Sequence, residues 1–170
     1  MSKVKVTMEN GKEFIIELYP EHAPLTVENF ENLVKDGFYD GLTLHRIISG
    51  FMIQGGDPLG NGTGGSDEEI KGEFSANGVE NNLSHTRGAI SMARSMANDS
   101  ASSQFFIVHQ DSLYLDGQYA VFGYVTDGIE IVDEIADTPV DFSISVNVFL
   151  LSSTNSLYNS VKVTLFLEKY

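Results

Sequence analysis

The stretch LHRIISGFMIQGGD at residues 44–57 places a guanidinium, an amide and several bulky apolar side chains close together along the chain. Arg46 precedes the apolar pair Phe51 and Met52, and Gln54 follows them. Side chains alternate between the two faces of a strand, so Met52 and Gln54 are expected on one face. The stretch therefore predicts β structure that carries apolar and polar side chains on the same surface.

A second informative stretch is SSQFFIVHQDSLYLDGQYAVFG at residues 102–123. Alternation places Gln104 and Phe106 on one strand face and Phe105 and Ile107 on the other. Both faces are bulky, so the outer face is not simply wetted by solvent. We expect Phe105 to point into a core and Phe106 to contribute to an apolar binding patch on the outside.

The rest of the chain predicts mostly strands. Alternating residues on both sides of Asn10 and Gly11 indicate a β-hairpin. Two amphipathic stretches predict helices at about 24–36 and 128–137, and the glycine-rich segment 57–85 predicts a long functional loop. Short β-branched and aromatic runs predict further strands at about 43–48, 52–56, 88–93, 103–109, 120–126 and 161–169.

Such a set of strands, with two helices and no internal repeat, favours a mainly β fold. Closing the sheet into an antiparallel barrel removes exposed edges, and the helices would cap its ends. The length of 170 residues suits one domain spanning 1–170. Residues 141–160 do not fit this scheme: SVNVFLL at 145–151 either competes with the terminal strand for a barrel edge or packs outside it. If exposed, that run is a candidate for self-association.

Composition excludes several classes of function. The chain has 24 Asp plus Glu against 10 Lys plus Arg, a net charge of −14, which disfavours binding to nucleic acid or to anionic membranes. It has no cysteine, which excludes disulfides, thiolate catalysis and Cys-ligated metals. The N-terminal residues lack a secretory apolar region and no apolar run is long enough to cross a bilayer, so a cytoplasmic protein is expected.

Three other chemistries are poorly supported. The sequence GNGTGG at 60–65 lacks the Gly-Lys-Ser/Thr ending of a phosphate-binding loop, so a tight loop is expected there. The four histidines show no spacing typical of metal ligands, and no GxSxG elbow is present for a serine hydrolase. No metal and no cofactor is predicted.

Five motifs occur together in an order and spacing that resemble one family. They are HRIISGFMIQGGD at 45–57, NGTGG at 61–65, GAISMA at 88–93, SQFFI at 103–107 and LDGQYAVFG at 115–123. Over residues 3–137 the chain resembles the cyclophilin-type peptidyl-prolyl cis-trans isomerases. The resemblance implies a closed eight-stranded antiparallel barrel capped by two helices, with a shallow outer groove that binds Xaa-Pro peptides.

The resemblance also implies roles for individual residues. Arg46 matches the catalytic arginine of the family, and Gln54 matches the glutamine that holds it and the substrate backbone. Tyr119 stands where many members have histidine and Tyr114 where some have tryptophan, which implies reduced affinity for cyclosporin. The residues implied in substrate binding are His45, Phe51, Met52, Thr63, Ala93, Arg94, Ser95, Gln104, Phe106, Tyr114, Leu115 and Tyr119.

The expected function is prolyl isomerisation that assists the folding of proline-containing chains, carried out by a monomer with chaperone character. Two alternatives stay open. One is a module that recognises proline motifs with little turnover, for which substitution of Arg46 would only weaken binding. The other is an unrelated barrel that holds a small ligand in an apolar interior, which the many bulky inward residues disfavour.

Overall fold

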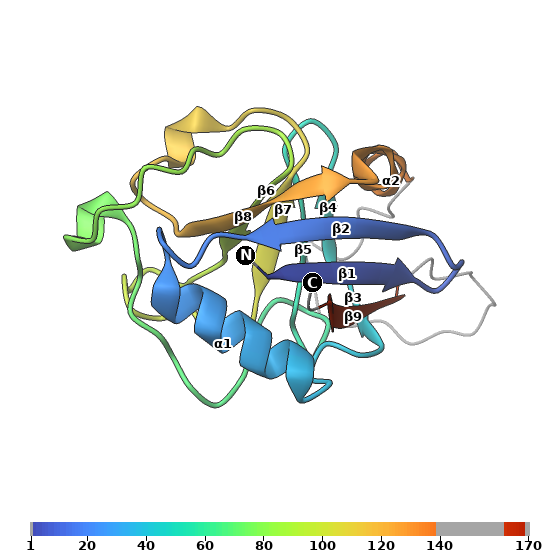
Figure 1. The fold of residues 1–170 in the computed structure, drawn as a ribbon, viewed down its shortest axis with the longest axis horizontal. Coiled ribbons are helices and arrows are strands. Elements are labelled where there is room, and N and C mark those ends of the chain that lie inside the picture. The colour runs from blue at the N-terminus through green and yellow to red at the C-terminus, as the bar shows by residue number, and fades with distance from the viewer. Residues whose placement is uncertain (1, 139–161, 169–170) are drawn as a thin grey trace, which may run out of the picture.

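The structure is a computed structural model that describes residues 2–138 and 162–168, the latter as backbone only. In these residues, nine strands form one curled sheet, and two α-helices pack against it (Figure 1). No helix in the described part of the chain is long and apolar enough to cross a membrane. The elements are β1 (Lys3–Met8), β2 (Glu13–Leu18), α1 (Pro24–Lys35), β3 (Leu42–Thr43), β4 (Arg46–Ile48), β5 (Met52–Gly55), the 3₁₀ turn η1 (Ser75–Asn77), β6 (Ala89–Met92), β7 (Phe105–Val108), the 3₁₀ turn η2 (Leu113–Leu115), β8 (Val121–Asp127), α2 (Ile129–Ala136) and β9 (Lys162–Glu168).

The sheet is antiparallel in every described pairing, with the order β3-β9-β1-β2-β8-β6-β7-β5-β4. The mainly β class with two helices is confirmed, but the prediction of a closed eight-stranded barrel is wrong. Among the described residues no ladder joins β3 to β4, so the sheet curls without closing. Only Leu44 and His45 separate these two terminal strands, so the covalent chain spans the gap where a ladder would be.

This gap also explains why the predicted strand at 43–48 is divided. Leu42 and Thr43 pair with β9, whereas Arg46 begins the ladder with β5 at the other end of the sheet. Leu44 lies between them, with its side chain buried in the core. The chain therefore changes strand partners within two residues, and one run of sequence serves both ends of the sheet.

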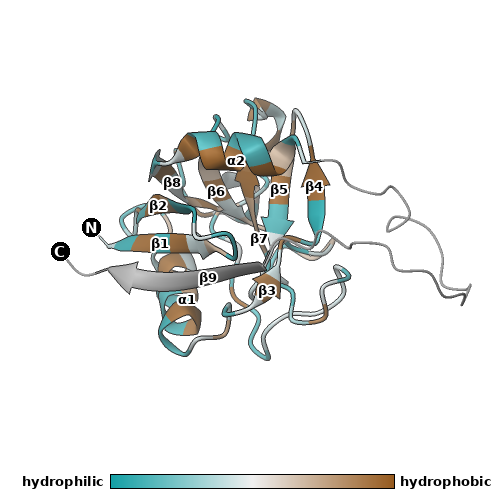
Figure 2. Ribbon diagram, turned by 90° about the vertical axis from the view of Figure 1, so that its right-hand side faces the viewer, coloured by the Kyte–Doolittle hydropathy of each residue, from teal (hydrophilic) through white to brown (hydrophobic). Residues whose placement is uncertain are grey.

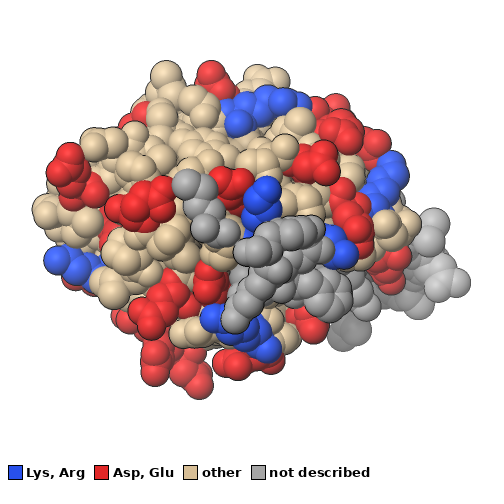
Figure 3. All heavy atoms as spheres, viewed as in Figure 1, with Lys and Arg blue, Asp and Glu red and all other residues tan. Residues whose placement is uncertain are grey.

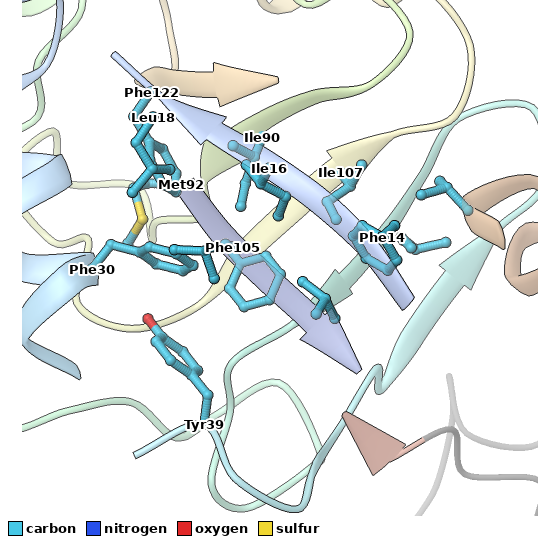
Figure 4. Packing of buried hydrophobic residues seen from close by; sticks show 14 of the residues in the cluster. Phe14, Ile16, Leu18, Phe30, Tyr39, Ile90, Met92, Phe105, Ile107 and Phe122 are labelled. Atoms are coloured by element: carbon cyan, nitrogen blue, oxygen red, sulfur yellow. The ribbon is translucent and has the colours of Figure 1, made fainter. Parts of the chain in front are cut away.

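The main core lies on the concave side of the sheet and is closed by the helices. In α1, Val27, Phe30 and Val34 recur at helical spacing and are buried. The Phe30 ring contacts those of Tyr39 and Phe105 at centroid distances of 5.2 and 5.6 Å (Figure 4). Two views place α1 and α2 on opposite sides of the β1–β2 hairpin, where each helix covers part of the core (Figures 1 and 2).

A smaller apolar cluster lies on the opposite face of β5, β6, β7 and β8. Phe105 belongs to the main core, whereas its neighbour Phe106 belongs to this second cluster with Met52, Val108 and Val121. The predicted division of the two phenylalanines between an inner and an outer face is confirmed. The sheet thus presents an apolar outer surface on which a site can be built.

The other predicted elements agree closely with the observed ones. The helices predicted at 24–36 and 128–137 correspond to α1 and α2, and the terminal strand predicted at 161–169 corresponds to β9. The segment 141–160, including 145–151, lies outside the described residues. The assignment of the chain to one domain stays a prediction.

Candidate active site

A cavity of about 170 Å³ opens on the outer apolar face of the sheet. It is smaller than the roughly 300–1,000 Å³ of pockets that hold drug-sized ligands, so its size suits a single side chain. All the lining residues belong to the set predicted from sequence. They are Arg46, Phe51, Met52, Gln54, Ala93, Arg94, Phe106, Leu115 and Tyr119.

The floor of the cavity is apolar and rigidly supported. Met52 and Phe106 are 1% and 6% exposed, and they lie on adjacent strands because β5 pairs with β7. Half-buried Phe51 and Leu115 extend this surface from the loop before β5 and from the end of η2. The floor therefore offers a preformed apolar surface to a ring.

The polar side of the cavity is a connected row of side chains. Arg46 and Gln54 are register partners in β4 and β5, and an Arg46 Nη1–H donates to Gln54 Oε1 over 3.2 Å. The Gln54 amide donates to Gln104 Oε1 over 2.9 Å. Gln104 in turn donates to the carbonyls of Gly62 and Gly64 over 3.1 and 2.7 Å. The guanidinium is thereby oriented by side chains that are themselves anchored to backbone.

The loop that anchors Gln104 is organised by a buried carboxylate. Asp57 is 1% exposed and accepts N–H groups from Leu59, Asn61 and Gly62. Burial alone would raise the pKa of Asp57, but these backbone hydrogen bonds outweigh it and hold the pKa below its usual value. A Cβ on Gly64 would lie 2.2 Å from Asp57 Oδ1, so this position requires glycine. The predicted tight loop at 60–65 is confirmed.

A second cation, Arg94, lines the cavity, and its side chain stacks against aromatic rings. The Arg94 guanidinium carbon lies 4.7 Å from the ring centroid of Tyr119 and 5.0 Å from that of Phe74. Its nitrogens donate to the carbonyls of Gln118 and Ser95. Arg94 therefore holds the Tyr119 wall against the rest of the protein by stacking and by hydrogen bonds.

Five of the predicted site residues do not line the cavity. Gln104 stands behind Gln54, and exposed Tyr114 lies at the rim, with its ring 6.1 Å from that of Phe51. Thr63 donates to Asn61 Oδ1, and Ser95 bonds to Ser100. These four side chains therefore contact other residues of the protein and do not line the cavity.

The fifth, His45, is half-buried between Arg46 and the glycine loop. Its two ring nitrogens are buried without a hydrogen-bond partner in the described structure. Burial lowers the pKa of His45, and the neighbouring Arg46 charge adds to this, while Asp57 partly opposes it. His45 is therefore expected to be neutral, and its contact with substrate stays a prediction.

Sequence reasoning missed two residues that contact the site from beneath. The buried ring of His85 stacks on Phe106 at 5.9 Å, and its Nδ1 lies 2.7 Å from Asp116 Oδ1. These two residues are 31 positions apart, so spacing gave no signal that they meet. In the described part of the chain, no group of three or more His, Asp or Glu side chains could hold a metal ion.

The site is a small apolar cavity on the outer face of a curled antiparallel sheet, bordered by an arginine that Gln54 orients, and it is typical of a protein that binds one apolar group. The family model described as cyclophilin type peptidyl-prolyl cis-trans isomerase matches residues 3–154. The chain belongs to this family, and its activity is the cis-trans isomerisation of prolyl peptide bonds.

Named relatives and solved structures agree with this assignment. Peptidyl-prolyl cis-trans isomerase B of Bacillus subtilis is 48% identical over 133 residues, covering 78% of this chain and 90% of that protein. Peptidyl-prolyl cis-trans isomerase cypE of Dictyostelium discoideum is 42% identical over 149 residues, covering 83% and 94%. A Cryptosporidium parvum cyclophilin-type isomerase, crystallised in the presence of the dipeptide Ala-Pro, superposes with a TM-score of 0.82 at 27% identity, covering 99% of each chain.

Proposed function

We propose that the enzyme seats the proline ring of an Xaa-Pro segment in the outer cavity and accelerates rotation of the preceding amide through Arg46. The observation that carries this proposal is the guanidinium at the edge of an apolar floor, oriented by Gln54 and Gln104. The remaining lining residues are assigned to binding the ring and the adjacent backbone. The Ala-Pro dipeptide in the C. parvum crystals supports a peptide of this kind as the ligand.

The chemistry requires no covalent step. The amide barrier of about 18–20 kcal/mol arises because the nitrogen shares its lone pair with the carbonyl. Rotation localises that lone pair on a pyramidal nitrogen, which can then accept a hydrogen bond. Arg46 donates to the twisted amide more strongly than to either planar form, so its effect is specific to the transition state. Its charge persists across the physiological pH range.

The required acceleration exceeds what one hydrogen bond can supply. Free Xaa-Pro bonds exchange in roughly tens to hundreds of seconds, so a turnover of about 10²–10³ per second requires about 5–8 kcal/mol. A hydrogen bond to a charged group contributes about 1.5–3 kcal/mol. We assign the remainder to the low dielectric above Met52 and Phe106 and to the fixed proline ring, about which the preceding carbonyl swings.

The proposed substrates are proline-containing peptides and folding proteins in the cytoplasm, where the enzyme acts as a monomer with a chaperone role. The cavity is too small to contact much of a peptide besides the proline ring, so we expect the enzyme to act on many different client proteins. Cyclosporin is expected to bind with reduced affinity, because Tyr114 and Tyr119 replace the tryptophan and histidine of other members. Nucleic acids and membranes are not proposed as partners, because of the net charge of −14.

The test is exchange NMR on a short Xaa-Pro peptide with wild-type protein and with Arg46→Ala. We expect kcat/KM to fall by about 100-fold, the size of effect seen when one transition-state donor is removed, while the peptide dissociation constant changes by less than about threefold. Arg87→Ala is the matched control, because it removes an arginine that pairs with Asp133 of α2 and does not line the cavity. Peptide binding to the wild type without accelerated exchange would show a recognition module and reject the mechanism.

A further inference from the structure

Three polar side chains form a continuous row directly beneath the cavity floor. His85 Nδ1 lies 2.7 Å from Asp116 Oδ1, and His85 Nε2 lies 3.0 Å from Ser91 Oγ. His85 and Ser91 are both 0% exposed. The arrangement has the connectivity of a Ser-His-Asp catalytic triad, yet no part of the proposed mechanism uses it.

Access excludes nucleophilic catalysis by this row. A catalytic serine must present its oxygen to a reacting carbonyl. Ser91 instead lies within β6 with its side chain fully buried, and its hydroxyl is engaged by His85. Ser91 and His85 are therefore closed off from substrate, whereas the Asp116 side chain is partly exposed at the surface. The function of the row must be exerted through the residues that it contacts.

What the row supports is the cavity. The His85 ring lies nearly parallel to that of Phe106, with an interplanar angle of 13°, and meets the edge of Tyr119 at 6.4 Å. Ser91 is the register partner of Phe106 across β6 and β7. The Phe106 floor and the Tyr119 wall thus both pack against the imidazole of His85.

Asp116 extends the support to the opposite wall. It directly follows Leu115, which lines the cavity at the end of η2. Its carboxylate accepts the His85 backbone N–H over 2.7 Å and the hydroxyl of Ser84, in addition to the imidazole contact. Movement of His85 would therefore shift Phe106 and Leu115 together.

We propose that His85 is a positioning residue that sets the distance between the Phe106 floor and the Leu115 wall, and thereby the fit of the cavity to a proline ring. The inference rests on the proposed function, since it assumes that this cavity binds proline. Both ring nitrogens of His85 have a hydrogen-bond partner when the neutral imidazole donates from Nδ1 to Asp116 and accepts at Nε2 from Ser91. Burial lowers the pKa of His85 despite the nearby Asp116, which favours that neutral form.

His85→Phe tests the proposal, because it keeps a flat ring beneath Phe106 and removes both hydrogen bonds of the imidazole. We expect KM for an Xaa-Pro peptide to rise about tenfold and kcat to change by less than about threefold, since cavity fit contributes to ground and transition states alike. Asp116→Asn, made in the wild type, keeps an oxygen that can accept from the backbone N–H and the Nδ1–H of His85. This variant should retain most of the affinity for the peptide. Val132→Ala is the control for stability alone, because it opens space in α2 on the main-core side. It should lower the Tm without raising KM.

The outcomes are separable. A His85→Phe protein with lower Tm but unchanged KM and kcat would reduce His85 to a structural residue and overturn the inference. A wild type without accelerated exchange would reject the proposed function instead. Should His85→Phe not fold, ¹⁵N-histidine NMR of the wild type decides: saturation with the peptide should shift the His85 ring resonances and leave those of His22 in place. Unshifted His85 resonances would refute the inference.

Discussion

The Arg94 guanidinium carbon lies 4.7 Å from the ring centroid of Tyr119 and 5.0 Å from that of Phe74, at the edge of the cavity. Its nitrogens also donate to the backbone carbonyls of Gln118 and Ser95. Arg94 therefore packs against two aromatic rings, one of which is the Tyr119 wall of the cavity.

Replacing Arg94 should affect stability and binding together. Arg94→Met keeps much of the stem but removes the stacking cation and the hydrogen bonds to Gln118 and Ser95, so we expect a loss of about 1–2 kcal/mol in unfolding free energy. Peptide affinity should fall several-fold as Tyr119 loosens. Urea unfolding and peptide titration measure the two effects. Arg94→Lys is the informative comparison, because it keeps the charge without the planar fork, and full recovery by lysine would contradict a role for guanidinium geometry.

The lining of the site was predictable where strand alternation or an ordered motif fixes it. Alternation places Met52, Gln54 and Phe106 correctly, because the side-chain period of a strand leaves no choice. Alternation does not apply to loops, so the assignment of Thr63 and Ser95 to the site rests on the resemblance alone and stays a prediction. The contribution of His85 was unpredictable, because it depends on three-dimensional proximity to Asp116.

At the scale of elements, local sequence patterns predict that a helix or a strand exists, but they do not predict whether the sheet closes into a barrel. The amphipathic period of α1 and the run of β6 follow from neighbouring residues, and both were predicted within about a residue or two of their bounds. The division of 43–48 into β3 and β4 depends instead on pairing with β9, which is more than a hundred residues away along the sequence. A local strand signal cannot tell that one run will change partners.

The N-terminus of α1 also depends on a distant residue. Ala23 precedes the helix and has no side-chain acceptor, so the first N–H groups need another partner. Glu73, 3% exposed, accepts from the backbone N–H of Leu25 and of Thr26 over 3.0 and 2.8 Å and from the Thr26 hydroxyl over 2.7 Å. The long loop therefore supplies the cap that the helix lacks.

Glu73→Gln should reveal the strength of this cap. The amide removes the negative charge and one acceptor oxygen at a buried helix terminus, so we expect a loss of about 2 kcal/mol in unfolding free energy. For a chain of this size that corresponds to a fall in Tm of about 4–8 °C, measurable by calorimetry. Glu80→Gln makes the same chemical change at an exposed position of the same loop and should leave Tm nearly unchanged. Equal Tm values for the two variants would argue against the cap.

At the scale of the whole molecule, carboxylates dominate the electrostatics, and Figure 3 shows them spread over the face it displays. Buried His85 and half-buried His45 add a further dependence of stability on pH. Burial lowers the pKa of both His85 and His45 from 6.5, so between the folded and unfolded values the unfolded chain binds more protons. Their contribution to stability is complete well above pH 6.5 and is lost as pH falls through that window.

Stability should therefore decline in two stages on acidification. The first, below about pH 6.5, comes from His85 and His45. The second stage, below about pH 4, comes from Asp57 and Asp116. Burial raises their pKa values, but hydrogen bonds outweigh it and hold the pKa values below 3.8, so stability is lost as pH falls through the folded values.

Urea unfolding from pH 8 to pH 3 measures this profile of stability against pH. Subtracting the profile of a His45→Gln, His85→Phe double variant removes the charge repulsion common to both proteins. The difference should fall between pH 7 and pH 5, and a flat difference would mean that the two imidazoles titrate alike in the folded and unfolded states.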